Sequence, residues 1–170
     1  MTYAESILPE FDREMANTRK VLERVPEDKL DWQVHPKSHT LGWNANHLPE
    51  ILGWVHGVIA APSWDISPIG GEPYQSPNLT SREAILDLFD RNVAAARTAI
   101  AAAKDDQMTQ PWALLQAGKP LFTMSRTAMI RGFVLNHLIH HRATLCVYLR
   151  LNNIPVPGMY GPSGDEFTGW

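Results

Sequence analysis

The sequence has 170 residues, of which 44% are hydrophobic and 19% charged. This composition excludes a disordered chain, and the length suits one domain with its own core, so we expect a single domain over residues 1–170. The formal net charge is −3 and no lysine- or arginine-rich run is present, which argues against nucleic acid and anionic membranes as partners.

The cysteine content and the N-terminal segment favour a cytoplasmic location. Cys146 is the single cysteine, so no internal disulfide can form, as is usual in a reducing compartment. Residues 1–10 lack the basic start and apolar core of a secretion signal. No run approaches the roughly 18 apolar residues that a membrane-spanning helix requires, so we expect no membrane segment.

Two helices are predicted in the N-terminal part of the chain. The first runs from about Pro9 to Val25, where one face at helical spacing consists of Phe11, Met15, Thr18, Leu22 and Val25. The second covers roughly residues 41–60, where one face consists of His47, Ile51, Trp54 and Val58. Pro49 lies inside this second pattern and lacks an N–H group, so it should kink the helix or mark its true start.

A long connection and two further helices follow. Residues 61–80 contain four prolines and two glycines, which is typical of an irregular segment. A third helix is predicted over about residues 81–104, because Thr80 and Glu83 form a capping-box pattern at its start. A fourth is predicted over about residues 125–151, before a segment that contains Pro155.

The remaining segments carry weaker patterns. Within residues 105–124, Trp112-Ala-Leu-Leu, a turn at Gly118 and Pro120-Leu-Phe-Thr fit a short hairpin. The tail from Pro155 to Trp170 has four glycines and three prolines, so it should be irregular and lie across the helices. The four helices predict an all-α fold, a four-helix bundle with a long crossover between the second and third helices, because a tight antiparallel turn needs only a few residues.

Three of the seven histidines occupy core-facing positions of the predicted helices. His137 and His141 lie about 40° apart around a helix and about 6 Å apart along it. Both belong to the apolar stripe of the fourth helix, and His47 belongs to that of the second. Neutral imidazoles that converge from two helices can bind one divalent ion and leave a coordination position open, so a metal site is one interpretation of this spacing.

Other interpretations of these residues stay open at this point. A core histidine is more often hydrogen-bonded to a carbonyl group or water, and a histidine pair at this spacing occurs by chance in many helices. His140 competes with His141 as a partner of His137, but its position off the stripe makes it a flanking residue. Glu50 could orient a ligand or act as a base, although we favour a solvated side chain at the edge of the stripe.

Three further side chains near these motifs receive a structural or binding role. Cys146 points away from His141 around the helix and is interpreted as a packing residue. Arg142 is expected to pair with an acidic group on a neighbouring helix or in the tail, where the candidates are Asp165 and Glu166. Trp54 shares the stripe of His47 and is a candidate for the wall of a substrate pocket.

Two motifs of the chain resemble a known family. The segments Ser38-His-Thr-Leu-Gly-Trp-Asn-Ala-Asn-His47 and His137-Leu-Ile-His-His-Arg142, in this order, resemble the DinB-like superfamily of metal-binding four-helix bundles. The ending over residues 154–166 also resembles the tails of its members. The resemblance implies a divalent ion, with zinc and nickel as first candidates and iron as a further one, bound by His47, His137 and His141.

The same resemblance implies a range of functions. Some members are thiol transferases that use a low-molecular-weight thiol, so the chain is expected to be a metal-dependent enzyme for thiol transfer to a small molecule or for metal-assisted hydrolysis. The family pattern usually continues Arg-Gly-Gln, whereas Ala143 and Thr144 follow Arg142 here, so no function of the Gly-Gln pair is carried over. The alternatives are a non-catalytic protein that binds a metal or small ligand, and a helical interaction protein. The oligomeric state is left open by the sequence, and a homodimer is the commonest arrangement of soluble oligomers.

Overall fold

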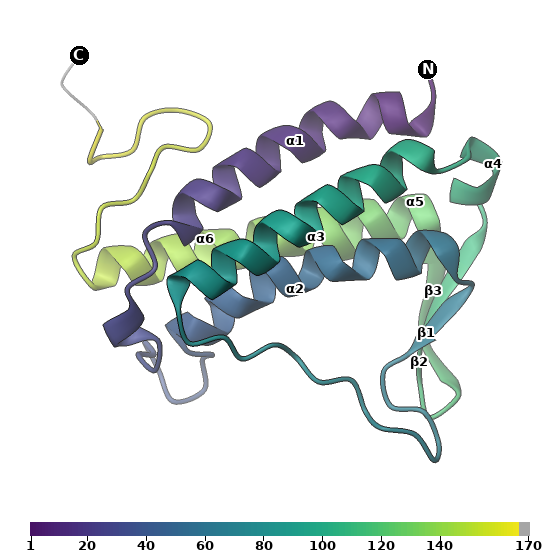
Figure 1. Cartoon of the computed structure of the whole chain (residues 1–170), viewed down its shortest axis with the longest axis horizontal. Helices are drawn as coiled ribbons and strands as arrows, with labels where there is room; N and C mark the ends of the chain where they lie inside the picture. Colours follow the sequence, from purple (N-terminus) through teal and green to yellow (C-terminus); the bar gives the residue numbers. More distant parts are fainter. Residues whose placement is uncertain (167–170) are drawn as a thin grey trace.

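The computed structural model describes residues 1–166, and most of them are helical (Figure 1). The longer helices are α1 (Tyr3–Leu22), α2 (Leu41–Ala60), α3 (Arg82–Ala102) and α6 (His137–Leu151). The short helices are η1 (Glu27–Lys29), α4 (Asp105–Met108) and α5 (Arg126–Ala128). A π-helical stretch, η2 (Met129–Asn136), joins α5 to α6 without a break. The strands are β1 (Ser63–Asp65), β2 (Pro111–Gln116) and β3 (Lys119–Ser125).

The long helices enclose the hydrophobic core. Helix α2 packs against α3 and α6, and α1 packs against the same two helices. Figure 1 shows that α2 and α3 run in one direction while α1 and α6 run in the other. The chain between α2 and α3 therefore returns along the length of the molecule, as the predicted crossover requires. Fully buried core side chains between these helices include Phe11, Leu48, Ile51, Ile85, Phe89, Leu138 and Leu145.

The prediction of an all-α fold is wrong, because the structure contains a three-stranded sheet in the order β1-β2-β3. Strands β2 and β3 form the antiparallel hairpin predicted within residues 105–124, with Ala117 and Gly118 at positive φ in the turn. Strand β1 belongs to the crossover and pairs in parallel with β2, where Trp64 lies opposite Leu114. Three residues carry no strand periodicity of their own, so only this long-range pairing makes β1 a strand.

Helix α1 begins before the predicted start at Pro9, because a capping box forms further upstream. The Thr2 hydroxyl accepts a hydrogen bond from the Glu5 backbone N–H at 3.2 Å, and the Thr2 N–H donates to the Glu5 carboxylate at 2.7 Å. Pro9 therefore lies inside the helix. The helix ends at Leu22 rather than Val25, although Val25 is fully buried in the core.

Helices α2 and α3 lie close to their predicted positions. Helix α2 has the predicted bounds, and Thr40 caps it by accepting a hydrogen bond from the Trp43 N–H at 3.1 Å. The helix continues through Pro49, so this proline does not mark its start. Helix α3 is capped by Ser81, which accepts from the Ala84 N–H at 3.2 Å, and not by the predicted Thr80.

The predicted fourth helix is present as α5, η2 and α6, but part of it is not an α-helix. A π-helical turn closes i→i+5 hydrogen bonds and holds more residues than an α-turn, so it changes the direction in which later side chains point. Leu138 and Arg142 are accordingly buried, whereas His137 and His141 are half-buried at the edge of the core. This position makes the two histidines accessible from outside the core.

The C-terminal tail is irregular and lies along α1 and α6, as predicted, up to residue 166 (Figure 1). The Asn17 side-chain amide of α1 donates to the Met159 carbonyl oxygen at 3.2 Å, and Arg150 of α6 forms an ion pair with Asp165. The rest of the predicted tail, including Trp170, lies outside the described residues.

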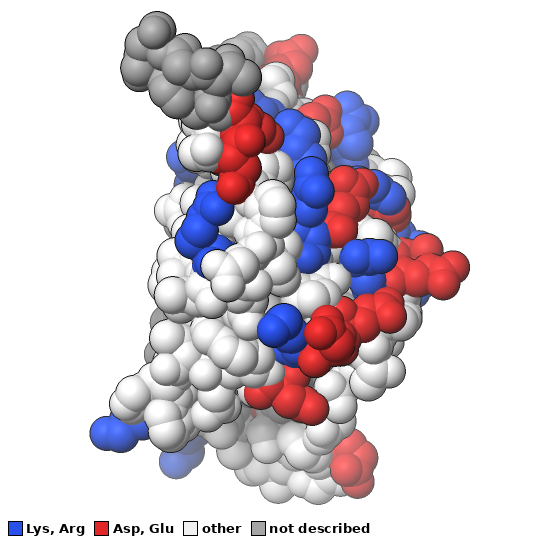
Figure 2. Space-filling model, turned by 90° about the vertical axis from the view of Figure 1, so that its left-hand side faces the viewer, with Lys and Arg blue, Asp and Glu red and all other residues white. Residues whose placement is uncertain are grey.

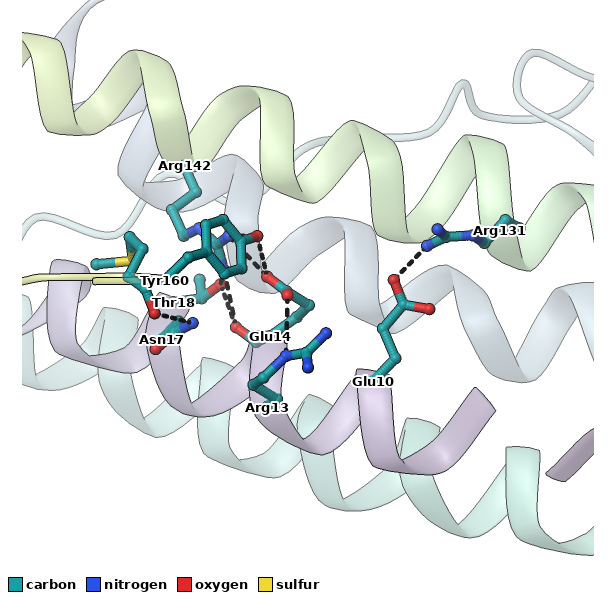
Figure 3. Close-up of polar contacts among 9 residues, drawn as sticks. Glu10, Arg13, Glu14, Asn17, Thr18, Arg131, Arg142 and Tyr160 are labelled. Carbon is teal, nitrogen blue, oxygen red and sulfur yellow. Dashed lines mark hydrogen bonds and ion pairs between the residues drawn. The ribbon is translucent and has the colours of Figure 1, made fainter. Parts of the chain in front are cut away.

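Arg142 pairs with Glu14 of α1 and not with the predicted tail residues Asp165 and Glu166 (Figure 3). Arg142 Nη2 and Glu14 Oε2 lie 2.7 Å apart, and both side chains are at most 3% exposed. The Tyr160 hydroxyl donates to the same Glu14 oxygen at 2.9 Å and accepts from Arg142 at 2.8 Å. The prediction of a structural role for Arg142 thus holds, with a different acidic partner.

Charged side chains are unevenly spread over the surface. On the face in Figure 2, acidic and basic side chains are interspersed over one flank, while much of the other flank carries neither. Because the two signs are interspersed, the described surface in this view has no extended patch of a single charge.

Over residues 1–166, no helix combines the length and the apolar character needed to cross a membrane.

Candidate metal centre

The three predicted histidines come together at one point between α2 and α6. Nε2 of His137 lies 3.3 Å from Nε2 of His47 and 3.0 Å from Nε2 of His141. The potential ligand atoms of all three residues lie within 4.8 Å of one another. Imidazole nitrogens that share one ion at bond lengths of about 2.0–2.1 Å are about 3.0–3.4 Å apart. The two Nε2 distances fit this range, so the triad is positioned to hold a metal ion.

The outward-facing nitrogen of each imidazole has an oxygen partner. His47 Nδ1 lies 2.6 Å from Glu50 Oε2, and His141 Nδ1 lies 3.1 Å from Asn44 Oδ1. His137 Nδ1 lies 3.3 Å from the Phe133 carbonyl oxygen. A neutral imidazole that donates from Nδ1 carries its lone pair on Nε2. In this tautomer the three Nε2 lone pairs point toward one another, which is the arrangement that a shared cation requires.

The local sequence of α2 positions both histidine partners on that helix. Asn44 and Glu50 lie three residues before and after His47, so all three share one side of the helix. The Asn44 amide nitrogen donates to the carbonyl oxygen of Thr40 at 2.9 Å, which directs its amide oxygen toward His141. The N-terminal turn of α2 thus fixes the orientation of a histidine on another helix.

The structure corrects the interpretation of Glu50 as a solvated side chain. Glu50 is only 5% exposed, and its second carboxylate oxygen accepts a hydrogen bond from the Ser76 hydroxyl at 2.6 Å. Burial raises the pKa of Glu50, but hydrogen bonds from His47 and Ser76 are among the effects that lower it, and together these effects outweigh burial. The net pKa therefore lies below its ordinary value. Glu50 is therefore an ionised carboxylate that holds His47 in place.

Burial keeps the two histidines of α6 neutral. It lowers the pKa of His137, and the nearby His47 contributes in the same direction. Burial, together with the neighbouring His47 and His137, lowers the pKa of His141 to about 3. Only a neutral imidazole offers a lone pair to a metal ion, so these shifts favour the protonation state that binds metal.

Aromatic rings surround the triad. Trp43 stacks on His47 with ring centroids 4.4 Å apart, and His39 stacks on the other face of Trp43 at 3.6 Å. Trp54 lies against both His47 and His137, at centroid distances of 5.6 and 5.8 Å. These rings restrict the orientation of the imidazoles and exclude water from their sides.

Two flanking residues have the positions predicted for them. His140 is exposed, and its ring meets the His141 ring edge-on at 4.9 Å without joining the triad. Cys146 is half-buried, and burial raises the pKa of its thiol. A thiol with a raised pKa is a poor nucleophile, in agreement with a packing role.

A cavity of about 250 Å³ opens beside the triad. Trp54 lines it, as the sequence suggested. The other lining side chains come from α2, the crossover, β2 and η2, and include His47, Glu50, Trp64, Tyr74 and Phe133. A small molecule in this cavity would therefore lie beside His47.

Sequence reasoning missed three contributors to this centre. Asn44 could have been found, because it lies one helical turn from His47 inside the quoted motif. Ser76 and the Phe133 carbonyl gave no signal. Ser76 lies in the irregular crossover, and the Phe133 carbonyl belongs to the π-helical stretch, which the sequence did not predict.

Comparison with known proteins places the chain in a family. The model of the DinB superfamily matches residues 10–145. The chain is 25% identical over 165 residues to the uncharacterized protein YrdA of Bacillus subtilis (strain 168), covering 96% of this chain and 92% of YrdA.

Crystal structures of two DinB-like proteins have a similar fold. The protein from Bacillus cereus ATCC 10987 is 23% identical, with a TM-score of 0.68, and the match covers 92% of this chain and 97% of that protein. YjoA from Bacillus subtilis is 15% identical, with a TM-score of 0.68 and coverage of 93% and 99%. Since the family model spans most of the sequence, including all three histidines, this chain belongs to the DinB superfamily.

Proposed function

We propose that the chain binds one divalent transition-metal ion and acts as a metal-dependent enzyme on a small molecule. The observation that carries this proposal is the convergence of three Nε2 atoms whose Nδ1 atoms are all engaged by oxygen acceptors. Zinc and nickel are the first candidates and iron is a further one, because imidazole suits each of these ions. The ligands are His47, His137 and His141.

Two reaction classes use the chemistry that this centre supports. An ion held by neutral imidazoles retains most of its charge, and when bound it lowers the pKa of a thiol or a water molecule placed against it. Transfer of a low-molecular-weight thiol to an electrophilic small molecule and hydrolysis of an ester or amide both require such activation. The cavity beside His47 supplies the space for the substrate.

The residues of the chain have separate tasks in this proposal. Glu50 orients His47 and offsets part of the charge at the centre through that imidazole. Asn44 orients His141 in the same way. Trp43 and Trp54 hold the rings and limit the entry of water to the side of the cavity.

The first test is metal content, measured by elemental analysis of protein purified without an affinity tag. We expect about one equivalent of metal per chain in the wild type, because the three histidines form a single site. His47→Ala and His137→Ala should lose it. His140→Ala is the matched control, because this exposed neighbour is outside the triad and should retain the metal. Equal metal content in all four proteins would contradict the proposed site.

The second test is turnover of the metal-loaded protein with small thiols plus electrophiles and, separately, with esters and amides. Activity should disappear in His137→Ala while the circular dichroism spectrum is unchanged. Turnover that persists in variants of all three histidines would refute a role for the ion. Metal binding without turnover in either panel would favour the non-catalytic binding protein.

A further inference from the structure

A second and larger cavity, of about 540 Å³, lies between α2, α3 and the returning crossover. Its walls include residues of α2, β1, α3 and β2, among them Gly57, Trp64, Leu88 and Trp112. It shares Glu50, Trp54, Trp64 and Tyr74 with the smaller cavity beside the triad. Because these side chains line both spaces, a ligand in the larger cavity lies next to the candidate metal centre.

Four aromatic side chains line this cavity. Trp54 of α2, Trp64 of β1, Tyr74 of the crossover and Trp112 of β2 all contribute to its lining. The rings of Trp54 and Trp64 are 6.0 Å apart, and Tyr74 meets Trp64 edge-on at 4.8 Å. Aromatic surfaces in this arrangement favour a planar apolar ligand, which stacks on an exposed ring face.

The charges at the cavity favour an uncharged ligand. Glu50 is the single charged residue of its lining, and both carboxylate oxygens of Glu50 are already bonded, to His47 and Ser76. An anion would find no cationic side chain among the lining residues. An anion would therefore lose its hydration without a partner, and the Glu50 carboxylate, which already accepts hydrogen bonds from His47 and Ser76, offers a cation less than a free carboxylate does.

We propose that this cavity binds an uncharged, planar and mainly apolar part of a small molecule and presents the reactive end of that molecule to the triad. The volume lies inside the range of about 300–1,000 Å³ that is typical of small-molecule sites. The first half of the proposal depends only on the cavity. The second half rests on the proposed function, because it requires an ion at the triad.

Gly57 allows the cavity to be filled without touching the triad. A Cβ atom added to Gly57 would meet no other atom within 4 Å, and Gly57 lines the cavity. Leucine has a higher helix propensity than glycine, so Gly57→Leu should fold. Gly132 of η2 also has free space around an added Cβ atom but is not part of the lining, so Gly132→Leu is the matched control.

The experiment is calorimetric titration of each protein with three probes of one shape: neutral 2-naphthol, anionic 2-naphthoate and cationic 2-naphthylmethylammonium. We expect 2-naphthol to bind the wild type and Gly132→Leu alike and at least ten times more tightly than either charged probe. Gly57→Leu should weaken 2-naphthol binding at least tenfold. Equal binding of a charged probe, or undiminished 2-naphthol binding to Gly57→Leu, would overturn the proposal.

Metal content measured on the same samples separates this proposal from the proposed function. Binding of 2-naphthol to a protein that takes up no metal would support the cavity and refute the metal-dependent enzyme. Metal uptake without 2-naphthol binding would refute the cavity proposal and leave the proposed metal site supported. In protein loaded with paramagnetic cobalt, the proton signals of 2-naphthol should broaden beyond those seen with zinc, and equal line widths would overturn the position next to the triad.

Discussion

Replacement of Glu14 by glutamine tests the buried ion pair that joins α1 to α6. Glu14→Gln removes the negative charge and leaves the shape of the side chain almost unchanged. Arg142 would then keep its charge in a position where it is 3% exposed, with neutral partners alone: the new glutamine oxygen, the Thr18 hydroxyl, the backbone carbonyl of residue 14 and the Tyr160 hydroxyl. The perturbation therefore creates one uncompensated buried charge (Figure 3).

The magnitude follows from the burial of both partners. Removal of one member of a buried pair lowers the free energy of unfolding by about 3–5 kcal/mol. The glutamine oxygen can still accept a hydrogen bond from Arg142, so we expect the lower end, about 3 kcal/mol. At about 2–4 °C per kcal/mol for a chain of this length, the melting temperature should fall by about 6–12 °C.

The assay is thermal unfolding followed by circular dichroism, with every protein treated with a chelator so that metal content is equal. Asp12→Asn is the matched control, because Asp12 also lies on α1 but pairs with Arg97 in an exposed position, with side chains 45% and 51% exposed. Exposed pairs contribute little, so this control should melt close to the wild type. If Glu14→Gln lowered the melting temperature no more than Asp12→Asn does, the reasoning would be refuted.

Three further predictions concern the tail and the candidate centre. Tyr160→Phe removes the hydroxyl that bonds both Glu14 and Arg142, so it should lower the free energy of unfolding by about 1 kcal/mol. Amide hydrogen exchange in residues 152–166 should also become faster, and unchanged exchange would contradict this prediction. Glu50→Gln should weaken metal affinity about 10–100-fold in competition with a chromophoric chelator, because His47 loses its carboxylate partner. A metal concentration of about 100 times Kd should stabilise the wild type by about 2.7 kcal/mol, visible as a higher melting temperature, and an equal rise in His47→Ala would contradict the site.

The helices and the three histidines could be predicted from the sequence because the signals for them are local. Helical periodicity depends on residues three and four apart, and this spacing places α2 correctly and puts His137 and His141 on one face. The Gly118 turn likewise marks the hairpin of β2 and β3 within its own few residues. A local pattern with a short repeat needs no knowledge of the rest of the fold.

Contacts between distant segments were decided by the tertiary structure alone. The pairing of β1 with β2, the bond from Ser76 to Glu50 and the ion pair of Arg142 with Glu14 all join segments that have no shared pattern in the sequence. Asp165, Glu166 and Glu14 all have the charge that Arg142 needs in a partner. The packing of α1 against α6 places Glu14 next to it. The sequence by itself determined which three histidines form the candidate centre. The packing of α6 on α2 determined that Asn44 orients His141, and the crossover determined that Ser76 holds Glu50, because burial and hydrogen bonding depend on the whole fold.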